Sequence, residues 1–137
     1  MLQQSEDFPL QLDRLYLRSR SRYPTFVAWN ADAIVGLLNG AFNMDFANNR
    51  DFVEFGLPLT PHAFVERIYF QPSARCAGVG GALVAHLALE ASSHGCGFIG
   101  GSLDLASDAT VRRRFFERRG FTISGFDTFG AVTSNVL

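Results

Sequence analysis

A run of glycines between an apolar segment and a helical pattern constrains this chain more than any other feature of its sequence. Residues 70–87 read FQPSARCAGVGGALVAHL, with three glycines within four positions. Glycine inside a helix costs roughly 0.5–1 kcal/mol relative to alanine, so its presence at a helix start needs a reason. The first amides of a helix lack internal partners, and the helix dipole adds about half a positive charge there. We therefore predict that loop 75–81 cradles a diphosphate, with a direct charge contact from Arg75.

Two common nucleotide-binding motifs do not fit this stretch. Residues 78–83 read GVGGAL, which keeps the first two glycines of the dinucleotide fingerprint GxGxxG but ends in leucine. The P-loop ends in Gly-Lys-Ser/Thr, and this chain contains no lysine, since all twelve basic residues are arginine. The absence of lysine also excludes a lysine nucleophile or Schiff base.

The composition is that of one globular domain spanning residues 1–137. Apolar residues make up 47% of the chain, which is enough for a hydrophobic core, and the net charge is −1. The near-neutral charge argues against a nucleic-acid or membrane partner. The N-terminal sequence lacks the basic start and apolar stretch of a signal peptide, and no run is long enough to span a membrane, so we expect a cytoplasmic location.

The order of apolar and turn residues predicts an α+β domain with a mixed sheet. Leu10, Leu12, Leu15 and Leu17 have a short helical spacing within 8–20. Segment 43–61 predicts a long loop with one short helix. Segment 121–134 predicts one or two closing strands. We expect the remaining strands at 25–30, 33–42, 63–70 and 97–105, and the remaining helices at 78–94 and 108–119, the last with Asp108 as its N-cap.

Packing can be predicted for some of these elements. The helix at 78–94 presents an apolar stripe made of Val79, Leu83, Leu87 and Ala91. Two glycines in the strand at 33–42, Gly36 and Gly40, indicate bulges or close backbone approach.

The two cysteines of the chain lie on either side of the helix at 78–94. About 17 helical residues would place Cys76 and Cys96 roughly 25 Å apart, so we expect two free thiols. Cys76 near the helix start is a candidate nucleophile, although a small loop residue is the simpler interpretation.

At this point the sequence resembles a known family, the GNAT acetyltransferases. Residues 75–80, RCAGVG, resemble the family signature Arg/Gln-x-x-Gly-x-Gly/Ala. Ile68, Phe70 and Pro72 match its apolar-x-apolar-x-Pro strand, and residues 115–121, FFERRGF, match its late helix ending, usually Tyr-Glu-x-x-Gly-Phe. Residues 33–40, AIVGLLNG, resemble its third strand, so the resemblance covers about 24–126 in the right order.

The resemblance implies a mostly antiparallel sheet that splays between its two central strands, and a single acyltransferase domain with its core at 24–126. Acetyl-CoA would be the co-substrate, with its diphosphate on the amides of 76–81 and its pantetheine arm between strands 63–70 and 97–105. Acetyl transfer would go directly to an amine, most simply that of a small molecule, and a homodimer is a candidate assembly. The residues expected to bind acetyl-CoA are Ile68, Tyr69, Phe70, Arg75, Cys76, Ala77, Gly78, Val79, Gly80, Gly81, Ala82 and Phe116.

Two departures from the family pattern bear on this expectation. Family members usually begin with a strand and a long helix, whereas only a shortened helical part, 1–23, precedes the first hairpin here. The first strand is then missing, reduced or contributed otherwise. The second departure is Phe116, where the family usually has tyrosine.

The acceptor amine must be neutral to attack, so a base should remove its proton. Alternation along strand 63–70 places Glu66, Ile68 and Phe70 on one face, with Val65, Arg67 and Tyr69 on the other. Family members often carry Glu or His at the position of Glu66, which makes Glu66 the expected base, the alternative being a solvated edge residue. His62 is a second candidate base. The spacing of histidines and cysteines predicts no metal site.

The loop at 43–61 is the expected acceptor site. Asp45, Asp51 and Glu54 stand among four phenylalanines within 42–55, a combination that suits a cationic amine with an apolar body. The alternative is a solvated loop that folds its phenylalanines inward.

Five arginines between 112 and 119 crowd one short helix. We interpret them as a solvated face that can also meet the 3′-phosphate of CoA, with a nucleic-acid patch as the alternative. Two function classes follow from the sequence. The first is an N-acetyltransferase, and the second is a non-catalytic acyl-CoA-binding module or sensor with a degenerate acceptor site.

Overall fold

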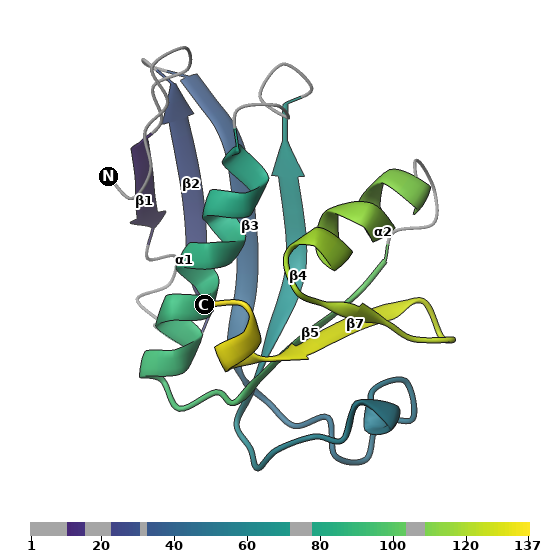
Figure 1. Cartoon of the computed structure of the whole chain (residues 1–137). Helices are drawn as coiled ribbons and strands as arrows, with labels where there is room; N and C mark the ends of the chain where they lie inside the picture. Colours follow the sequence, from purple (N-terminus) through teal and green to yellow (C-terminus); the bar gives the residue numbers. More distant parts are fainter. Residues whose placement is uncertain (1–10, 16–22, 31–32, 72–77, 104–108) are drawn as a thin grey trace.

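The computed structural model describes residues 11–15, 23–30, 33–71, 78–103 and 109–137. In these residues seven strands form one sheet, accompanied by two α-helices and two short 3-10 helices (Figure 1). The elements are β1 Gln11–Leu15, β2 Thr25–Asn30, β3 Ala33–Met44, η2 Val53–Phe55, β4 His62–Phe70, α1 Val79–Ser93, β5 Phe98–Ser102, α2 Ala109–Arg118, β6 Thr122–Ile123, β7 Thr128–Val132 and η4 Thr133–Asn135.

The sheet has the order β1-β2-β3-β4-β5-β7-β6 and splits at its centre. All neighbouring strands run antiparallel except β4 and β5, which are parallel. This one parallel pair joins only Ala63–Val65 to Ile99–Gly101, and the two strands diverge beyond it (Figure 1). The mixed α+β fold and the splay between the central strands are therefore confirmed.

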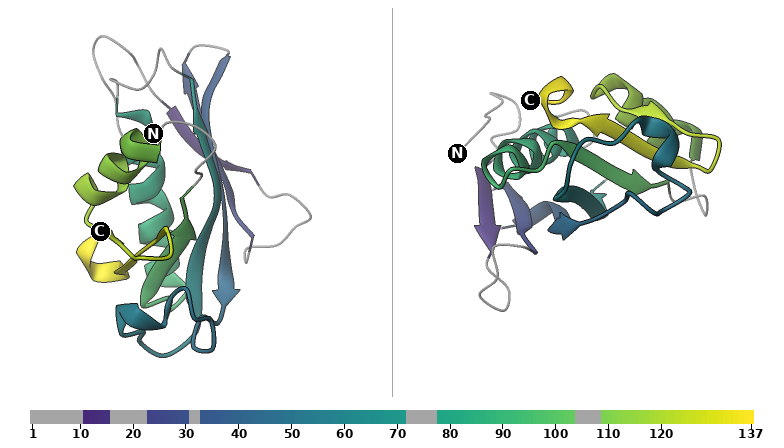
Figure 2. Two further views of the ribbon diagram at one scale, coloured as in Figure 1. Left: turned by 90° about the vertical axis from the view of Figure 1, so that its right-hand side faces the viewer. Right: turned by 90° about the horizontal axis from the view of Figure 1, so that it is seen from below.

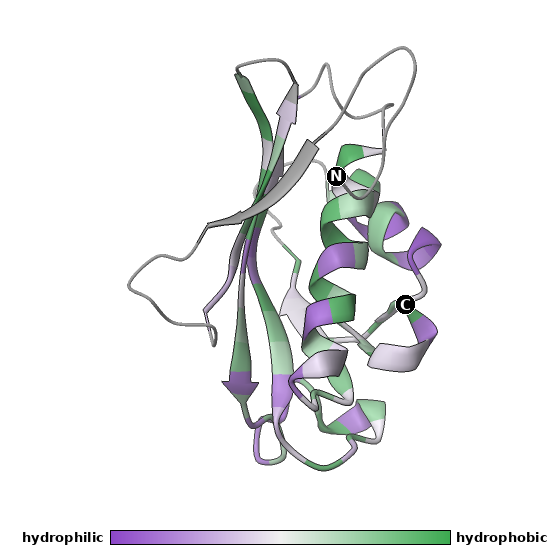
Figure 3. Cartoon of the chain, turned by 90° about the vertical axis from the view of Figure 1, so that its left-hand side faces the viewer, coloured by the Kyte–Doolittle hydropathy of each residue, from purple (hydrophilic) through white to green (hydrophobic). Residues whose placement is uncertain are grey.

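Helix α1 lies across β2, β3 and β4 and supplies the main core (Figure 2). Its predicted stripe, Val79, Leu83, Leu87 and Ala91, is completely buried. The remainder of the helix is more polar, and the hydropathy colours alternate along it (Figure 3). No helix in the described ranges is long and apolar enough to cross a membrane.

The two glycines of β3 allow α1 to approach the sheet closely, as predicted. A Cβ atom on Gly36 would lie 2.6 Å from Cγ1 of Val79, and one on Gly40 would lie 3.0 Å from Cδ1 of Leu87. Side chains at these positions would hold α1 away from the sheet, because atoms this close must move apart.

The N-terminal segment differs from its prediction, since residues 11–15 form an edge strand and not a helix. Gln11 pairs with Trp29 and Leu15 pairs with Thr25, antiparallel to β2. The leucines at 10, 12, 15 and 17 fit a strand almost as well as a helix, and the unpaired backbone edge of β2 decides between them. The first strand of the sheet is therefore present.

The long loop between β3 and β4 packs as a second small core. Phe46, Phe52 and Phe98 are buried together, and the rings of Phe46 and Phe52 stack with centroids 4.3 Å apart. The expected short helix is η2. The phenylalanines of this loop therefore turn inward, as the alternative interpretation held.

A glycine of β5 lies against an aromatic ring, which gives a first prediction. A Cβ atom on Gly101 would overlap the ring of Phe129 and lie 2.7 Å from its Cε1. Replacement Gly101→Ala should therefore lower the free energy of unfolding by about 1–3 kcal/mol, measured by urea denaturation.

Gly125→Ala is the matched control, because a Cβ atom there meets nothing within 4 Å. Its effect should stay within about 0.5 kcal/mol. Equal losses for the two variants would show that the contact with Phe129 is not what requires glycine at position 101.

Candidate active site

The glycine stretch forms the N-terminus of α1 as the sequence predicted. Gly78 is the N-cap and has left-handed backbone angles, φ 79° and ψ 15°. The first internal helix bond runs from the amide of Ala82 to the carbonyl of Gly78, at 3.0 Å. The amides of residues 79–81 thus precede that bond and have no helix carbonyl to pair with.

This geometry refines the set of predicted anion-binding residues. Ala82 cannot offer a free amide, because that group is already bonded inside the helix. The side chains of Val79 and Ala82 are buried in the core, so Val79 has only its backbone to offer a ligand. Arg75, Cys76 and Ala77 lie outside the described residues.

A cavity of about 280 Å³ opens directly at these amides. Gly78, Gly80 and Gly81 form one wall, and α2 with the residue after it forms the other through Val111, Arg114, Phe115, Arg118 and Arg119. None of these described lining residues is acidic.

The arginines give this cavity, called the anion cavity below, a positive wall. The guanidinium carbon of Arg119 would lie 2.8 Å from a Cβ atom on Gly81 and stands 5.4 Å from the ring centroid of Phe115. In the described ranges, no carboxylate lies at ion-pair distance from Arg114, Arg118 or Arg119. The anion cavity therefore combines amides that precede the first internal helix bond with guanidinium groups that no described carboxylate pairs, which suits a phosphate.

A second cavity, of about 220 Å³, lies where β4 and β5 diverge, and it is called the cleft below. Its walls come from β4, β5, α2 and β7. The lining residues are Val65, Glu66, Arg67, Ile68, Ser102, Arg112, Phe116 and Phe129.

Glu66 occupies a bulge in β4 and is exposed in the cleft. Arg67 pairs with Asn39 of β3, and Val65 pairs with the next β3 residue, Gly40, so Glu66 is an extra residue between them. The prediction that Val65 and Ile68 point to opposite faces was wrong, because both contact the α1 core across this bulge. A bulge frees one residue from the ladder and re-aims its side chain, and bulges are frequent next to active sites.

The other β4 residues predicted to bind acetyl-CoA do not all line the cleft. Ile68 lines the cleft. Tyr69 is 56% exposed, does not line the cleft and pairs with Leu37 of β3. The backbone of Phe70 pairs with Gly36.

Phe116 forms the aromatic floor of the cleft. Its ring is buried and stacks on Phe129 with centroids 3.7 Å apart and an interplanar angle of 14°. Phe115 and Phe121 contact the same ring edge-on. Phe116 lines the cleft and brings no hydroxyl group there, and its contact with acetyl-CoA stays a prediction.

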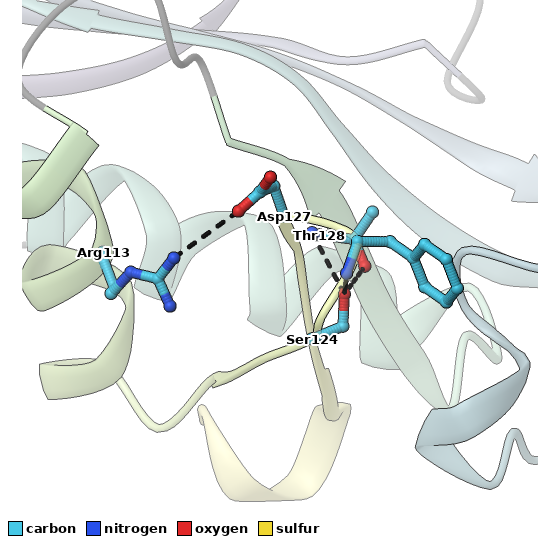
Figure 4. A network of polar contacts seen from close by, with 5 residues as sticks. Arg113, Ser124, Asp127 and Thr128 are labelled. Carbon is cyan, nitrogen blue, oxygen red and sulfur yellow. Dashed lines mark hydrogen bonds and ion pairs between the residues drawn. The ribbon is translucent and has the colours of Figure 1, made fainter.

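A salt bridge and a tight turn attach α2 to the β6–β7 hairpin. Arg113 lies 3.5 Å from Asp127, whose φ is 59°. The hydroxyl of Ser124 accepts the amide of Thr128 at 3.2 Å and contacts its hydroxyl at 2.6 Å (Figure 4). The salt bridge links the exposed side of α2 to the hairpin, and the Ser124–Thr128 contacts lie within the hairpin itself.

The three acidic loop residues do not line the cleft. The carboxylate of Asp45 accepts the amide of Ala47 at 2.9 Å and borders a separate cavity near His94. The carbonyl of Asp51 accepts the hydroxyl of Thr128 at 2.8 Å, and Glu54 is exposed on η2. Their role in acceptor binding remains a prediction, without the aromatic surface that was expected beside them.

His62, the second candidate base, is engaged in the fold. The amide of Phe46 donates to Nδ1 at 2.9 Å, so Nε2 carries the proton and donates to the carbonyl of Pro58 at 2.8 Å. The side chain is completely buried and stacks on the ring of Phe46. Both ring nitrogens are occupied, so His62 has no free nitrogen to take a proton from a substrate.

The thiol and metal chemistry of the described residues is limited. Burial raises the pKa of the Cys96 thiol to about 11, so it stays protonated near neutral pH. Among the described residues, no cluster of histidine, cysteine and acidic side chains could hold a metal ion.

Sequence reasoning missed Phe129 and Arg112 as residues of the cleft. Phe129 reaches it through the pairing of β7 with β5, which a single sequence does not reveal. Arg112 precedes Phe116 by one helical turn, and this spacing was a usable signal.

The sequence profile of the acetyltransferase (GNAT) family matches residues 2–121. A structure of a GNAT-family protein from Desulfovibrio desulfuricans has a TM-score of 0.68 at 14% identity, covering 90% of this chain and 99% of that one. A mutant AtaT toxin bound to the C-terminus of the antitoxin AtaR and acetyl-CoA has a TM-score of 0.67 at 13% identity, covering 93% and 95%. A comparison with curated proteins gave no match.

Nourseothricin acetyltransferase is a further similar structure, with a TM-score of 0.63 at 18% identity. The alignment covers 82% of this chain but only 66% of that enzyme. The profile match extends over most of the chain, and the chain therefore belongs to the GNAT acetyltransferase family.

The environment of His62 gives a second prediction. His62→Ala leaves the Phe46 amide and the Pro58 carbonyl without partners inside the fold. The free energy of unfolding should fall by about 2–4 kcal/mol in urea denaturation. His94→Ala is the comparison, since His94 is exposed at the end of α1, and its effect should be about 1 kcal/mol or less. A small loss at His62 together with a large loss of kcat would restore it as a candidate base.

Proposed function

We propose that this chain transfers an acetyl group from acetyl-CoA directly to the amine of a small molecule. The observation that carries the proposal is the pair of cavities that share α2 as a wall. One cavity joins helix amides to guanidinium charge, and the other holds a carboxylate at a strand bulge. A molecule with a diphosphate at one end and a reactive thioester at the other fits this pair.

The anion cavity would hold the phosphates of acetyl-CoA. The amides of residues 79–81 can donate to the diphosphate, and the arginines at 114, 118 and 119 can pair with its charge or with the 3′-phosphate. Membership of the acetyltransferase family and the acetyl-CoA in the AtaT complex support this choice of ligand.

The cleft would hold the pantetheine arm and the thioester. Beyond Val65, β4 loses β5 as its neighbour, so its backbone edge is open to an extended ligand. The amine attacks the thioester carbon, the C–N bond forms and the C–S bond breaks. Glu66 takes the proton that the amine gives up, because it is the only carboxylate among the described lining residues.

A small-molecule acceptor is supported by the likeness to nourseothricin acetyltransferase, which is named for such an acceptor. The competing function is an acyl-CoA-binding module without catalysis, which the aromatic floor at Phe116 would permit. Release of free thiol from acetyl-CoA, measured across a panel of polyamines, arylalkylamines and neutral or acidic amines, separates the two. Release of thiol with at least one amine supports the enzyme. If acetyl-CoA binds but no amine causes thiol release, the result supports the binding module.

The anion cavity gives a third prediction. Gly81→Glu should weaken acetyl-CoA binding at least tenfold, about 1.4 kcal/mol, because its carboxylate competes with the phosphates for Arg119. An acidic residue in the first turn of a helix favours helix formation, so the variant should remain folded. Isothermal titration calorimetry measures the affinity.

Gly81→Gln is the matched control, with nearly the same shape and no charge. Its affinity for acetyl-CoA should exceed that of Gly81→Glu, and the difference should account for most of the tenfold loss. Equal affinities for the two folded variants would contradict phosphate binding in the anion cavity.

The role of Glu66 gives a fourth prediction. Glu66→Gln should lower kcat by roughly 10²–10⁴, the range of general base catalysis, while the affinity for acetyl-CoA stays the same. Glu117→Gln, an exposed carboxylate on α2 that does not line the cleft, should keep the wild-type rate. If Glu66→Gln retains kcat within a factor of two, water and not Glu66 is the proton acceptor.

A further inference from the structure

The arginines of α2 face three different ways. Arg114 and Arg118 line the anion cavity, and Arg113 pairs with Asp127 of the hairpin. Arg112 alone among the described arginines of α2 lines the cleft, one turn before Phe116. The helix thus presents one guanidinium group to the place where the thioester would lie.

The surroundings of Arg112 leave its charge available to a ligand in the cleft. Its side chain is half-buried, and in the described part of the chain no carboxylate lies at ion-pair distance from it. Phe116 and Phe129 supply an apolar floor beside it. A charge next to apolar rings interacts more strongly with a second charge than it would in water.

We propose that the Arg112 guanidinium stabilises the negative charge on the sulfur of CoA as the thiolate leaves, and that it is a catalytic residue of this chain. The inference rests on the proposed function. When the amine attacks, the C–S bond breaks and its electron pair goes to sulfur, while the amine proton goes to Glu66. Arg112 stays protonated throughout, since an arginine side chain does not lose its proton in proteins. It therefore contributes charge and hydrogen bonds, and no proton.

The other polar groups of the cleft are less suited to this role. Arg67 follows the bulge in β4, where it is the strand partner of Asn39, and it is exposed. Ser102 is neutral, and a neutral hydrogen bond is roughly half as strong as one in which a partner is ionised. Glu66 carries no positive charge in either protonation state, so it cannot stabilise a thiolate by charge. Phe116 offers no hydroxyl at all.

The test uses CoA itself, the product of the reaction, so it does not depend on finding the acceptor. A guanidinium within about 4–6 Å should lower the pKa of the bound thiol by about 1 to 3 from its free value near 8.5. The affinity for CoA, relative to desulfo-CoA, should then rise with pH up to the free pKa, by about 10-fold to 1000-fold in total. Calorimetric titrations of both ligands from about pH 5 to about pH 10 measure this ratio, and these limits lie about 3.5 units below and about 1.5 units above that free pKa.

Four variants decide the assignment. Arg112→Gln should abolish most of the rise with pH in CoA affinity relative to desulfo-CoA, called the gain below. It should also lower kcat by roughly 10²-fold with any accepted amine. Arg112→Lys should keep most of the gain, since it keeps the charge. Arg113→Gln, the neighbour held by Asp127, should behave as the wild type. Glu66→Gln should enlarge the gain, because it removes the opposing charge in the cleft.

Several outcomes would overturn the proposal. One is a wild-type CoA affinity that follows desulfo-CoA at every pH, and another is an Arg112→Gln variant that keeps the full gain with an unchanged melting temperature. Equal losses in Arg112→Gln and Arg112→Lys would make Arg112 a packing residue. If the wild type binds neither CoA nor desulfo-CoA, the proposed function itself fails, and that result is distinct from the others.

Discussion

The separation of β4 from β5 after three paired residues is the constraint on which the rest of the molecule depends. Two strands joined over their whole length would leave no cleft, and Glu66 would lie in a continuous ladder. The stacked rings of Phe116 and Phe129 fill the space beneath the opening, and Gly101 lets Phe129 lie flat against β5. The cleft is therefore a product of packing, since its walls cannot close without displacing two buried rings.

The sequence predicted best what depends on neighbouring residues. The strand at 63–70 and the helix at 78–94 were assigned almost to the residue, because the glycines at the helix start and the stripe led by Leu83 act locally. It predicted less well what depends on distant pairing. β1 was assigned as a helix because only the open edge of β2 selects a strand there. The bulge at Glu66 was missed, since strict alternation gives no sign of an inserted residue.

The same distinction between neighbouring residues and distant pairing applies to the candidate site. Gly78–Gly81 and Glu66 were found because a motif or a family resemblance marks them in the chain. Phe129 was not found, because it reaches the cleft only through its pairing across β5. The loop phenylalanines were weighed as a substrate surface, yet Phe46 and Phe52 are more favourable when buried against Phe98 than when exposed to water.

The distribution of charge on α2 argues against nucleic acid as the partner of its arginines. A surface that binds a nucleic-acid backbone presents its cations side by side toward one rod-like ligand. Here Arg112 faces the cleft, Arg113 is paired with Asp127, and Arg114, Arg118 and Arg119 surround a concave cavity at the amides of α1. Four of these five arginines thus place a positive field at two cavities and not along one continuous face. Such a field attracts a small polyanion that can enter them, and it reaches a duplex passing outside much less, because exposed charges are screened within about 8 Å at physiological salt.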